Sequence, residues 1–291
     1  MASAPETPIA FVRGQFVPRD TATIPLMDRG FLFGDGVYEV TAVIERRFVD
    51  NGPHLDRLDQ SLREIGIANP YDRAEWIGIE CELMRRNALD NGLIYIQVTR
   101  GVAERDFLFP PDLAPSVVLF AQNRRVQHNP LIEKGAAVIT LPDQRWARCD
   151  IKSTSLLAQV LAKRAAAQAN ANEVWMTRDG YITEGASSTA FIVTPDGRLV
   201  TRTLSPAILP GVTRRTIMRI ADQSGLALAE RPFTRDEALE ATEAFYTSAS
   251  TIAIPVTRID GRIVANGQPG PVFRSLYDQY MQHVLENPQD F

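Results

Sequence analysis

The few lysines of this chain are its first candidates for covalent chemistry. The sequence has 31 lysines and arginines, and only Lys134, Lys152 and Lys163 are lysines. Lys134 lies in a Glu-Lys-Gly turn and Lys163 on the charged side of an expected helix, so we expect both to be solvated. Lys152 stands just before that helix, where the helix dipole opposes a cation and favours the neutral amine. A neutral amine attacks aldehydes, whereas a lysine that reaches from a loop into water is the simpler alternative.

A second candidate is Glu184, which is followed by small residues in the stretch 181–191. A carboxylate at the end of a strand, with small hydroxyl residues such as Ser187 after it, could hold a cationic ring nitrogen. An ordinary surface glutamate at a turn is the alternative interpretation.

A phosphate could bind where Leu209-Pro-Gly-Val-Thr213 begins a helix. A helix N-terminus offers unpaired N–H groups and a positive dipole end, and Val212 and Thr213 would supply the donors. A plain Pro-Gly helix start with Thr213 near the cap explains the pattern equally well.

Three other features fit the same ligand less specifically. Ser248, Ala249 and Ser250 form a small polar break that could donate further hydrogen bonds, although a loop is the simpler account. Arg57 lies off the leucine stripe of its expected helix. A solvated arginine is the usual explanation of such a position, and an arginine that pairs with a phosphate is the alternative. Tyr38 stands on an expected strand and would ordinarily be a core residue.

These candidates together describe a site for one compound. Lys152 suits an aldehyde, Glu184 a pyridine nitrogen, and Arg57 with the two donor stretches a phosphate. Pyridoxal 5'-phosphate carries all three groups, so the sequence predicts it as the cofactor.

The first half must position Tyr38 and Arg57 on a strand and a helix. We expect a hairpin at Gly14 and an extended run from Val37 to about Val49. A leucine stripe over 55–65 and a second stretch over 73–89 predict helices, and 93–99 and 117–121 predict strands.

The second half must position the lysine, the glutamate and the phosphate donors. Expected strands cover 136–141, 173–177, 181–183 and 189–194, and expected helices begin near Ser155, Gly211 and Pro271. A polar break gives the boundary, so we predict an N-terminal domain over 1–125, a linker over 126–133 and a C-terminal domain over 134–291.

Composition excludes several classes of protein. The net charge of −4 lacks the basic footprint of a nucleic-acid binder, and no apolar run reaches the length of a membrane span. The start of the chain has no signal pattern, and the two cysteines, Cys81 and Cys149, suit a reducing compartment, so cytoplasm is expected. The three histidines are far apart in sequence, so no metal site is expected.

The sequence resembles the fold type IV (class IV) pyridoxal-phosphate aminotransferases over nearly its whole length. The family pattern is met by eight residues: Glu184, Ser187, Phe191, Thr201, Leu209, Gly211, Val212 and Arg214. One position departs from it, because Thr189 replaces the usual asparagine. The resemblance implies a two-domain mixed α and β fold, with a small α+β N-terminal domain and a larger α/β C-terminal domain that binds the cofactor.

Within this family the likeness is to the D-amino acid (D-alanine) aminotransferases. It is carried by the stretches 28–39, 54–58, 98–110 and 148–153. It implies transfer of the amino group of a D-amino acid to a 2-oxo acid such as 2-oxoglutarate or pyruvate, by a homodimer whose active site borrows Arg105 from the partner. Phe107 departs from the best-known members, which have a histidine there.

The resemblance also implies a role for each candidate residue. Lys152 would hold the cofactor as a Schiff base and act as general base and acid, with Glu184 on the ring nitrogen. Tyr38, Arg105, Phe107 and Ser187 would surround the substrate. The phosphate and one ring face would be held by Arg57, Leu209, Val212, Thr213, Ser248, Ala249 and Ser250.

Other functions remain open as alternatives. Phe107 makes the pocket more apolar, which would suit an (R)-selective amine transaminase. A lyase such as aminodeoxychorismate lyase is disfavoured by Arg105. Branched-chain aminotransferases usually carry Gly-Asn-Tyr after the lysine, whereas here residues 153–157 read Ser-Thr-Ser-Leu-Leu. A dinucleotide-binding module at Gly34-Asp-Gly36 lacks its third glycine, and a catalytically silent dimer would not need Lys152 with Glu184.

Overall fold

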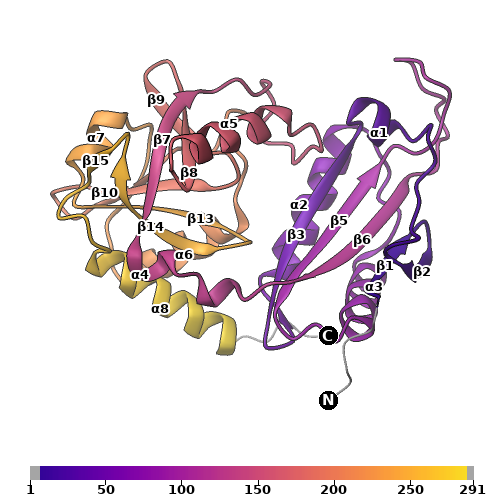
Figure 1. Ribbon diagram of the computed structural model, residues 1–291, viewed down its shortest axis with the longest axis horizontal. Coiled ribbons are helices and arrows are strands. Elements are labelled where there is room, and N and C mark those ends of the chain that lie inside the picture. The colour runs from indigo at the N-terminus through magenta and orange to yellow at the C-terminus, as the bar shows by residue number, and fades with distance from the viewer. Residues whose placement is uncertain (1–6, 287–291) are drawn as a thin grey trace. The chain divides into compact units, whose positions relative to one another are not determined.

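The computed structural model describes residues 7–286, which divide into two compact units (Figure 1). Unit 1 comprises residues 7–126 together with the short segment Ile151–Ser155. Of the described residues, unit 2 comprises Gln127–Asp150 and 156–286. The segment that contains Lys152 therefore packs with unit 1, although the chain on both sides of it belongs to unit 2.

Unit 1 is built on an antiparallel sheet in the order β2-β1-β6-β5-β3-β4. Its strands are β1 (Ile9–Val12), β2 (Gln15–Pro18), β3 (Gly36–Ile44), β4 (Arg47–Phe48), β5 (Gly92–Thr99) and β6 (Ser116–Asn123). Its helices are α1 (Arg29–Phe33), α2 (Asn51–Glu64) and α3 (Arg73–Arg86). The predicted hairpin at Gly14 is confirmed. The extended run predicted over 37–49 is broken, because Glu45 and Arg46 have φ of 49° and 63° and turn β3 back into β4.

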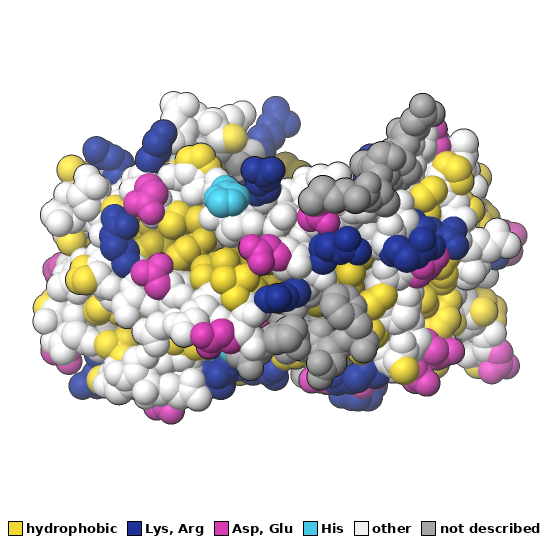
Figure 2. Space-filling model, turned by 90° about the horizontal axis from the view of Figure 1, so that it is seen from below, with side chains coloured by type: hydrophobic (Ala, Val, Ile, Leu, Met, Phe, Trp, Pro, Cys, Tyr) yellow, Lys and Arg dark blue, Asp and Glu magenta, His cyan; other side chains and the backbone are white. Residues whose placement is uncertain are grey.

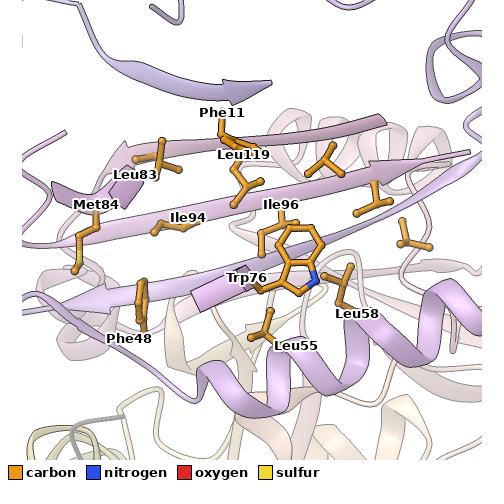
Figure 3. Packing of buried hydrophobic residues seen from close by; sticks show 14 of the residues in the cluster. Phe11, Phe48, Leu55, Leu58, Trp76, Leu83, Met84, Ile94, Ile96 and Leu119 are labelled. Atoms are coloured by element: carbon orange, nitrogen blue, oxygen red, sulfur yellow. The ribbon is translucent and has the colours of Figure 1, made fainter. Parts of the chain in front are cut away.

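The core of unit 1 lies between the sheet and helices α2 and α3. Figure 3 shows Trp76 of α3 beside Leu55 and Leu58 of α2 and Ile96 of β5. The predicted leucine stripe of α2 is buried there, and α3 begins with a capping box between Asp72 and Glu75. Each fully buried side chain of this kind contributes roughly 1.5–3 kcal/mol to folding.

Unit 2 is built on a mixed sheet in the order β12-β11-β10-β13-β14-β7-β8-β9, with β15 paired to β14. Its strands are β7 (Ala136–Pro142), β8 (Glu173–Arg178), β9 (Tyr181–Gly185), β10 (Thr189–Val193), β11 (Leu199–Thr201), β12 (Leu228–Glu230), β13 (Glu243–Ser248), β14 (Ile252–Ile259) and β15 (Arg262–Ile263). Its helices are α4 (Leu131–Lys134), α5 (Leu157–Gln168), α6 (Val212–Gln223), α7 (Arg235–Glu240) and α8 (Pro271–Glu286), with a 3-10 turn η1 (Val126–His128) at the boundary of the units. The pairs β14–β7, β7–β8 and β11–β12 are parallel and the others antiparallel.

The surface of the described residues carries charges of both signs. Figure 2 shows acidic and basic side chains interspersed on one face. No helix among residues 7–286 is both long enough and apolar enough to cross a membrane.

Candidate active site

Lys152 is fixed against the start of β3 in unit 1. Its carbonyl accepts a hydrogen bond from the amide of Tyr38 at 2.9 Å, and its own amide donates to Ser61 Oγ at 3.3 Å. The following residue, Ser153, forms an isolated β-bridge with Val37. These backbone contacts place Lys152 Nζ over the Tyr38 ring, 4.1 Å from its centroid. The lysine side chain thus lies over the face of an aromatic ring of unit 1.

The Tyr38 ring belongs to a row of three stacked aromatic rings on neighbouring strands. Tyr38 lies 5.6 Å from Tyr95 and Tyr95 lies 4.7 Å from Phe120, measured between ring centroids. Tyr95 donates to Gln97 Oε1 at 2.8 Å, and burial raises the pKa of Tyr95, so this phenol stays neutral. The Lys152 side chain therefore lies at one end of a row of stacked aromatic rings.

Arg57 is buried in unit 1 and paired with Glu39 of β3. Its Nε and Nη2 donate to the two oxygens of Glu39 at 2.7 and 2.9 Å, and His54 Nδ1 lies 2.8 Å from the same carboxylate. Burial acts to raise the pKa of Glu39, but Arg57 outweighs it and holds that pKa far below its ordinary value. Burial lowers the pKa of His54. Arg57 is therefore not the solvated arginine of the simpler interpretation. Its direction is set by Glu39, a residue that was not among those predicted for the site.

The predicted substrate residues of unit 1 lie on the loop of residues 101–110. Arg105 is exposed, with its guanidinium carbon 5.4 Å from the Phe33 ring centroid. Phe107 is 80% exposed, and its ring lies 5.7 Å from that of Phe33. Both side chains are available to a ligand or to another chain.

Glu184 in unit 2 is buried at the end of β9 and held by Arg145. Glu184 Oε1 accepts from Arg145 Nη1 and from the amide of Leu209, the latter at 3.0 Å. Burial raises the pKa of Glu184, and the Arg145 charge opposes that rise. Asp143 holds Arg145 in turn, through bonds of 3.0 and 2.9 Å. Both of these hydrogen bonds go to Oε1, so a ligand N–H could bind at Oε2.

The predicted phosphate donors of unit 2 surround the N-terminus of α6. Gly211 is the N-cap and has no side-chain cap, so the first amides of the helix are not satisfied by the cap residue. A Cβ at Gly211 would come within 2.8 Å of Thr189 Oγ1, and Thr189 pairs with Thr247 across β10 and β13. Thr247 Oγ1 is buried without a hydrogen-bond partner in the described chain.

The turn after β13 completes this group of donors. Ser248 Oγ lies 3.3 Å from Ser250 Oγ and 2.8 Å from Thr251 Oγ1, and Ala249 is half-buried between them. Val212 and Thr213 are buried, Leu209 is half-buried beside Glu184, and Ser187 is exposed. A close-fitting glycine, the first amides of α6 and these hydroxyl groups could together hold an anion, and this set of donors fits the phosphate of pyridoxal phosphate.

The family assignment follows from a match that covers most of both units. The family model for amino-transferase class IV matches residues 36–259. The chain belongs to this family. It is therefore an aminotransferase that uses pyridoxal phosphate.

Relatives of known name resemble the chain over nearly its full length. A D-alanine aminotransferase of Listeria monocytogenes is 38% identical over 94% of this chain and 96% of its own. A D-alanine aminotransferase of Staphylococcus aureus is 37% identical over 94% of this chain and 97% of its own. Among solved structures, a branched-chain aminotransferase of Thermoproteus uzoniensis with norvaline has a TM-score of 0.86 and 25% identity, covering 97% of this chain and 96% of its own. These matches confirm the fold and the family that the sequence motifs indicated.

Proposed function

We propose that this aminotransferase moves the amino group of a D-amino acid, of the D-alanine type, to a 2-oxo acid such as 2-oxoglutarate or pyruvate. The observation that carries this substrate class is the exposed Arg105 on the loop of residues 101–110, a cation suited to a substrate carboxylate. Relatives named D-alanine aminotransferases, 37–38% identical over 94% of the chain, support the same class.

Lys152 is proposed to bind the cofactor covalently and to move the reacting proton. Its Nζ takes the proton from the substrate α-carbon as general base and returns a proton as general acid. When bound, pyridoxal phosphate supplies an electron sink for the electron pair left at that carbon. Glu184 keeps the ring nitrogen protonated through its Oε2, while Leu209 covers one ring face.

The phosphate is proposed to be held by neutral and cationic donors. The amides of Val212 and Thr213 and the residues Ser248, Ala249 and Ser250 provide the neutral donors of unit 2, and Arg57 provides the charge. Glu39 fixes the direction of Arg57 through its two hydrogen bonds. A preoriented guanidinium loses little entropy when an anion binds, because its rotamer is already set.

Handedness is proposed to follow from where the carboxylate docks. Lys152 reaches one face of the reacting carbon, because its Nζ is held over the Tyr38 ring. Arg105 and Tyr38, with Ser187 and Phe107 around them, would place the carboxylate on the side that presents the α-hydrogen of a D-amino acid to that face. Phe107 is apolar and exposed, which favours (R)-amines as a secondary substrate class.

A homodimer is proposed to complete each active site with Arg105 of the partner. Unit 1 exposes large apolar side chains at Leu26, Phe31 and Leu108 in addition to Phe107, and unit 2 exposes Leu157 on α5. Exposed apolar groups of this size are typical of interaction surfaces. The cytoplasm is proposed as the location, because Cys81 and Cys149 are both free thiols.

A substrate panel tests the proposed function. Purified holoenzyme would be assayed with D-alanine, L-alanine and (R)-1-phenylethylamine, each with pyruvate or 2-oxoglutarate as acceptor. We expect turnover of D-alanine to dominate. Arg105→Ala should lower kcat/KM for D-alanine by roughly 10- to 100-fold and leave the carboxylate-free amine much less affected, because a charge-assisted bond to the carboxylate is lost.

Two lysine variants control this experiment. Lys152→Ala should lose all transamination and the cofactor adduct that borohydride traps, whereas Lys163→Ala, which alters an exposed lysine on α5, should keep both. Preferred turnover of L-alanine, or equal losses on both substrates in Arg105→Ala, would contradict the proposal.

A further inference from the structure

Asp35 joins two buried arginines beside the loop of residues 101–110. Its Oδ2 accepts from Nε of Arg29 and from Nε of Arg100, each at 2.8 Å. The side chains of Arg29, Arg100 and Asp35 are 5%, 9% and 15% exposed. Burial acts to raise the pKa of Asp35, but the hydrogen bonds and charges of Arg100 and Arg29 hold it below its ordinary value. This carboxylate therefore stays ionised and keeps two guanidinium groups, which would otherwise repel each other, in fixed positions.

Arg29 connects Asp35 to the loop of residues 101–110 through hydrogen bonds. Its Nη1 donates to the carbonyl of Asp106 at 2.6 Å, and its Nη2 to the carbonyl of Phe107 at 3.5 Å. The same guanidinium lies 4.6 Å from the Phe33 ring centroid, against which Arg105 lies at 5.4 Å on the loop. Arg29 thus holds the backbone directly after Arg105 and also the ring that the Arg105 side chain contacts.

Other contacts of the cluster anchor the two ends of the loop. At its start, the amide of Arg29 donates to the carbonyl of Gly101 at 2.9 Å. At its end, the Phe109 ring lies 3.9 Å from the Arg100 guanidinium. Arg100 also donates to the carbonyls of Ile65 and Gly66 at 2.7 and 3.1 Å, so the loop is tied to the end of α2. Between these anchors, Arg29 holds the middle of the loop through its two part-buried bonds to the carbonyls of Asp106 and Phe107.

We propose that Asp35 is a positioning residue for substrate recognition, which fixes the loop of residues 101–110 through Arg29 and so aims Arg105 and Phe107. The proposal rests on the proposed docking of the substrate carboxylate on Arg105. A displacement of about 1 Å in a group that positions substrate can cost about 100-fold in rate. Loss of Asp35 would therefore act on substrates with a carboxylate and spare amines that lack one.

Asp35→Asn removes the anion while keeping the shape of the side chain, and tests this inference. Hydrogen exchange of the holoenzyme, followed by mass spectrometry, should show the amides of residues 104–108 exchanging at least about 10-fold faster, because local opening becomes easier. The ratio of kcat/KM for D-alanine to that for (R)-1-phenylethylamine should fall about 10- to 100-fold, with the larger part of the loss in KM. Asp112→Asn, an exposed aspartate close by in sequence, is the matched control and should change neither quantity.

Arg29→Lys covers the case in which Asp35→Asn does not fold. It keeps the positive charge, but a single ammonium cannot bridge Asp35 and both loop carbonyls, so the same two changes are expected. Unchanged exchange of residues 104–108 in folded Asp35→Asn or Arg29→Lys would overturn the inference. Faster exchange with equal losses on both substrates would uphold the positioning of the loop by Asp35 and refute carboxylate docking on Arg105.

Discussion

Glu184 depends on a neighbouring cation for its charge. Its side chain is buried, which raises the pKa of its carboxyl, and Arg145 opposes the rise most strongly, followed by the Leu209 amide. Asp143 and the carbonyl of Ala207, at 3.2 Å, keep Arg145 in place. A carboxylate that holds a ring nitrogen protonated has to be ionised itself, so the role proposed for Glu184 depends on Arg145.

Arg145→Met should raise the pKa of Glu184 further and so favour its neutral acid, because the charge that opposes the rise is gone. We expect kcat to fall roughly 10- to 100-fold, as is typical when a residue that supports a functional group is removed. The loss should be partly reversed at higher pH, since a group with a raised pKa ionises as the pH increases. The measurement is the pH–rate profile of the holoenzyme.

Glu184→Gln is the matched control for that profile, because glutamine has no charge to recover. Its turnover should be slow at every pH, with the cofactor still bound. Arg145→Met and Glu184→Gln profiles of the same shape would show that Arg145 does not act through the charge of Glu184.

The sequence made some of these residues predictable and hid others. Lys152 stood out because lysine is rare in this chain, and Glu184 because small residues follow it. Arg145 stands in Pro-Asp-Gln-Arg-Trp, where nothing in the spacing separates it from the many other arginines. Glu39 could have been found, because a glutamate within the apolar strand Val37-Tyr-Glu-Val40 requires a buried partner.

At the scale of elements, the proposed phosphate site lies at the start of helix α6, which begins with a close-packed glycine. Gly211 has a φ of −62°, which any residue can adopt, so contact and not backbone strain requires glycine there. A Cβ would meet Thr189 Oγ1 at 2.8 Å and Arg214 Cβ at 3.2 Å. The N-terminus of α6 would have to move by some tenths of an ångström to admit it.

Gly211→Ala should therefore weaken cofactor binding, because the amides of Val212 and Thr213 would move away from the position proposed for the phosphate. A loss of about tenfold in affinity for pyridoxal phosphate corresponds to about 1.4 kcal/mol, the size of one hydrogen bond. Fluorescence titration of the apoenzyme would measure it. Gly78→Ala, within α3 where a Cβ meets nothing within 4 Å, is the control and should leave affinity unchanged while stabilising the helix.

Elements with a clear hydrophobic period, or with a local turn signal, were predictable from the sequence. A strand that is placed by pairing with a strand distant in sequence was not. The helices near Arg73, Gly211 and Pro271 and the hairpin at Gly14 are confirmed. Strand β14 (Ile252–Ile259) was missed, because it contains Pro255 and follows a polar stretch that ends in a turn. Its place next to β13 and β7 is set by hydrogen bonds to strands far away in sequence.

At the scale of the whole molecule, non-local pairing decides where Lys152 belongs. The bridge between Val37 and Ser153 and the bond from the Tyr38 amide to the Lys152 carbonyl tie residues 151–155 to unit 1. Local sequence could not predict this, since the segment lies between two parts of unit 2. The two units interleave along the chain, because residues 151–155 return to unit 1. The linker predicted over 126–133 is not tested by this division and stays a prediction.

Unit 1 also buries a second carboxyl group, which makes its stability depend on pH. Glu80 of α3 is fully buried and accepts from Asn51 Nδ2 at 2.7 Å, while its Oε1 has no hydrogen-bond partner in the described chain. Burial raises the pKa of Glu80 to about 8, and the negative charge of Glu39 adds to the rise. Glu39 already balances Arg57, so Glu80 is stable in this core as the neutral acid.

The sign of the pH effect follows from this raised pKa. Between the ordinary glutamate pKa of 4.5 and the folded value of about 8, the folded chain retains a proton that the unfolded chain releases. Glu80 therefore contributes stability below about pH 4.5, and that stability declines by about 1.4 kcal/mol per pH unit as the pH rises toward 8. Glu80→Gln keeps an acceptor for Asn51 and has no proton to release.

The free energy of unfolding of Glu80→Gln, relative to that of the wild type, should consequently increase as the pH is raised from 5 to 8. Urea titrations at three pH values in that interval would measure the difference, with the holoenzyme used throughout so that cofactor binding contributes alike to both proteins. Glu104→Gln, at an exposed position, should follow the wild type at each pH. A difference between Glu80→Gln and the wild type that does not change with pH would mean that Glu80 is ionised in the folded protein. The core of unit 1 would then need a further cation or ordered water at Glu80 Oε1, because a second buried anion next to Glu39 cannot be balanced by Arg57 alone.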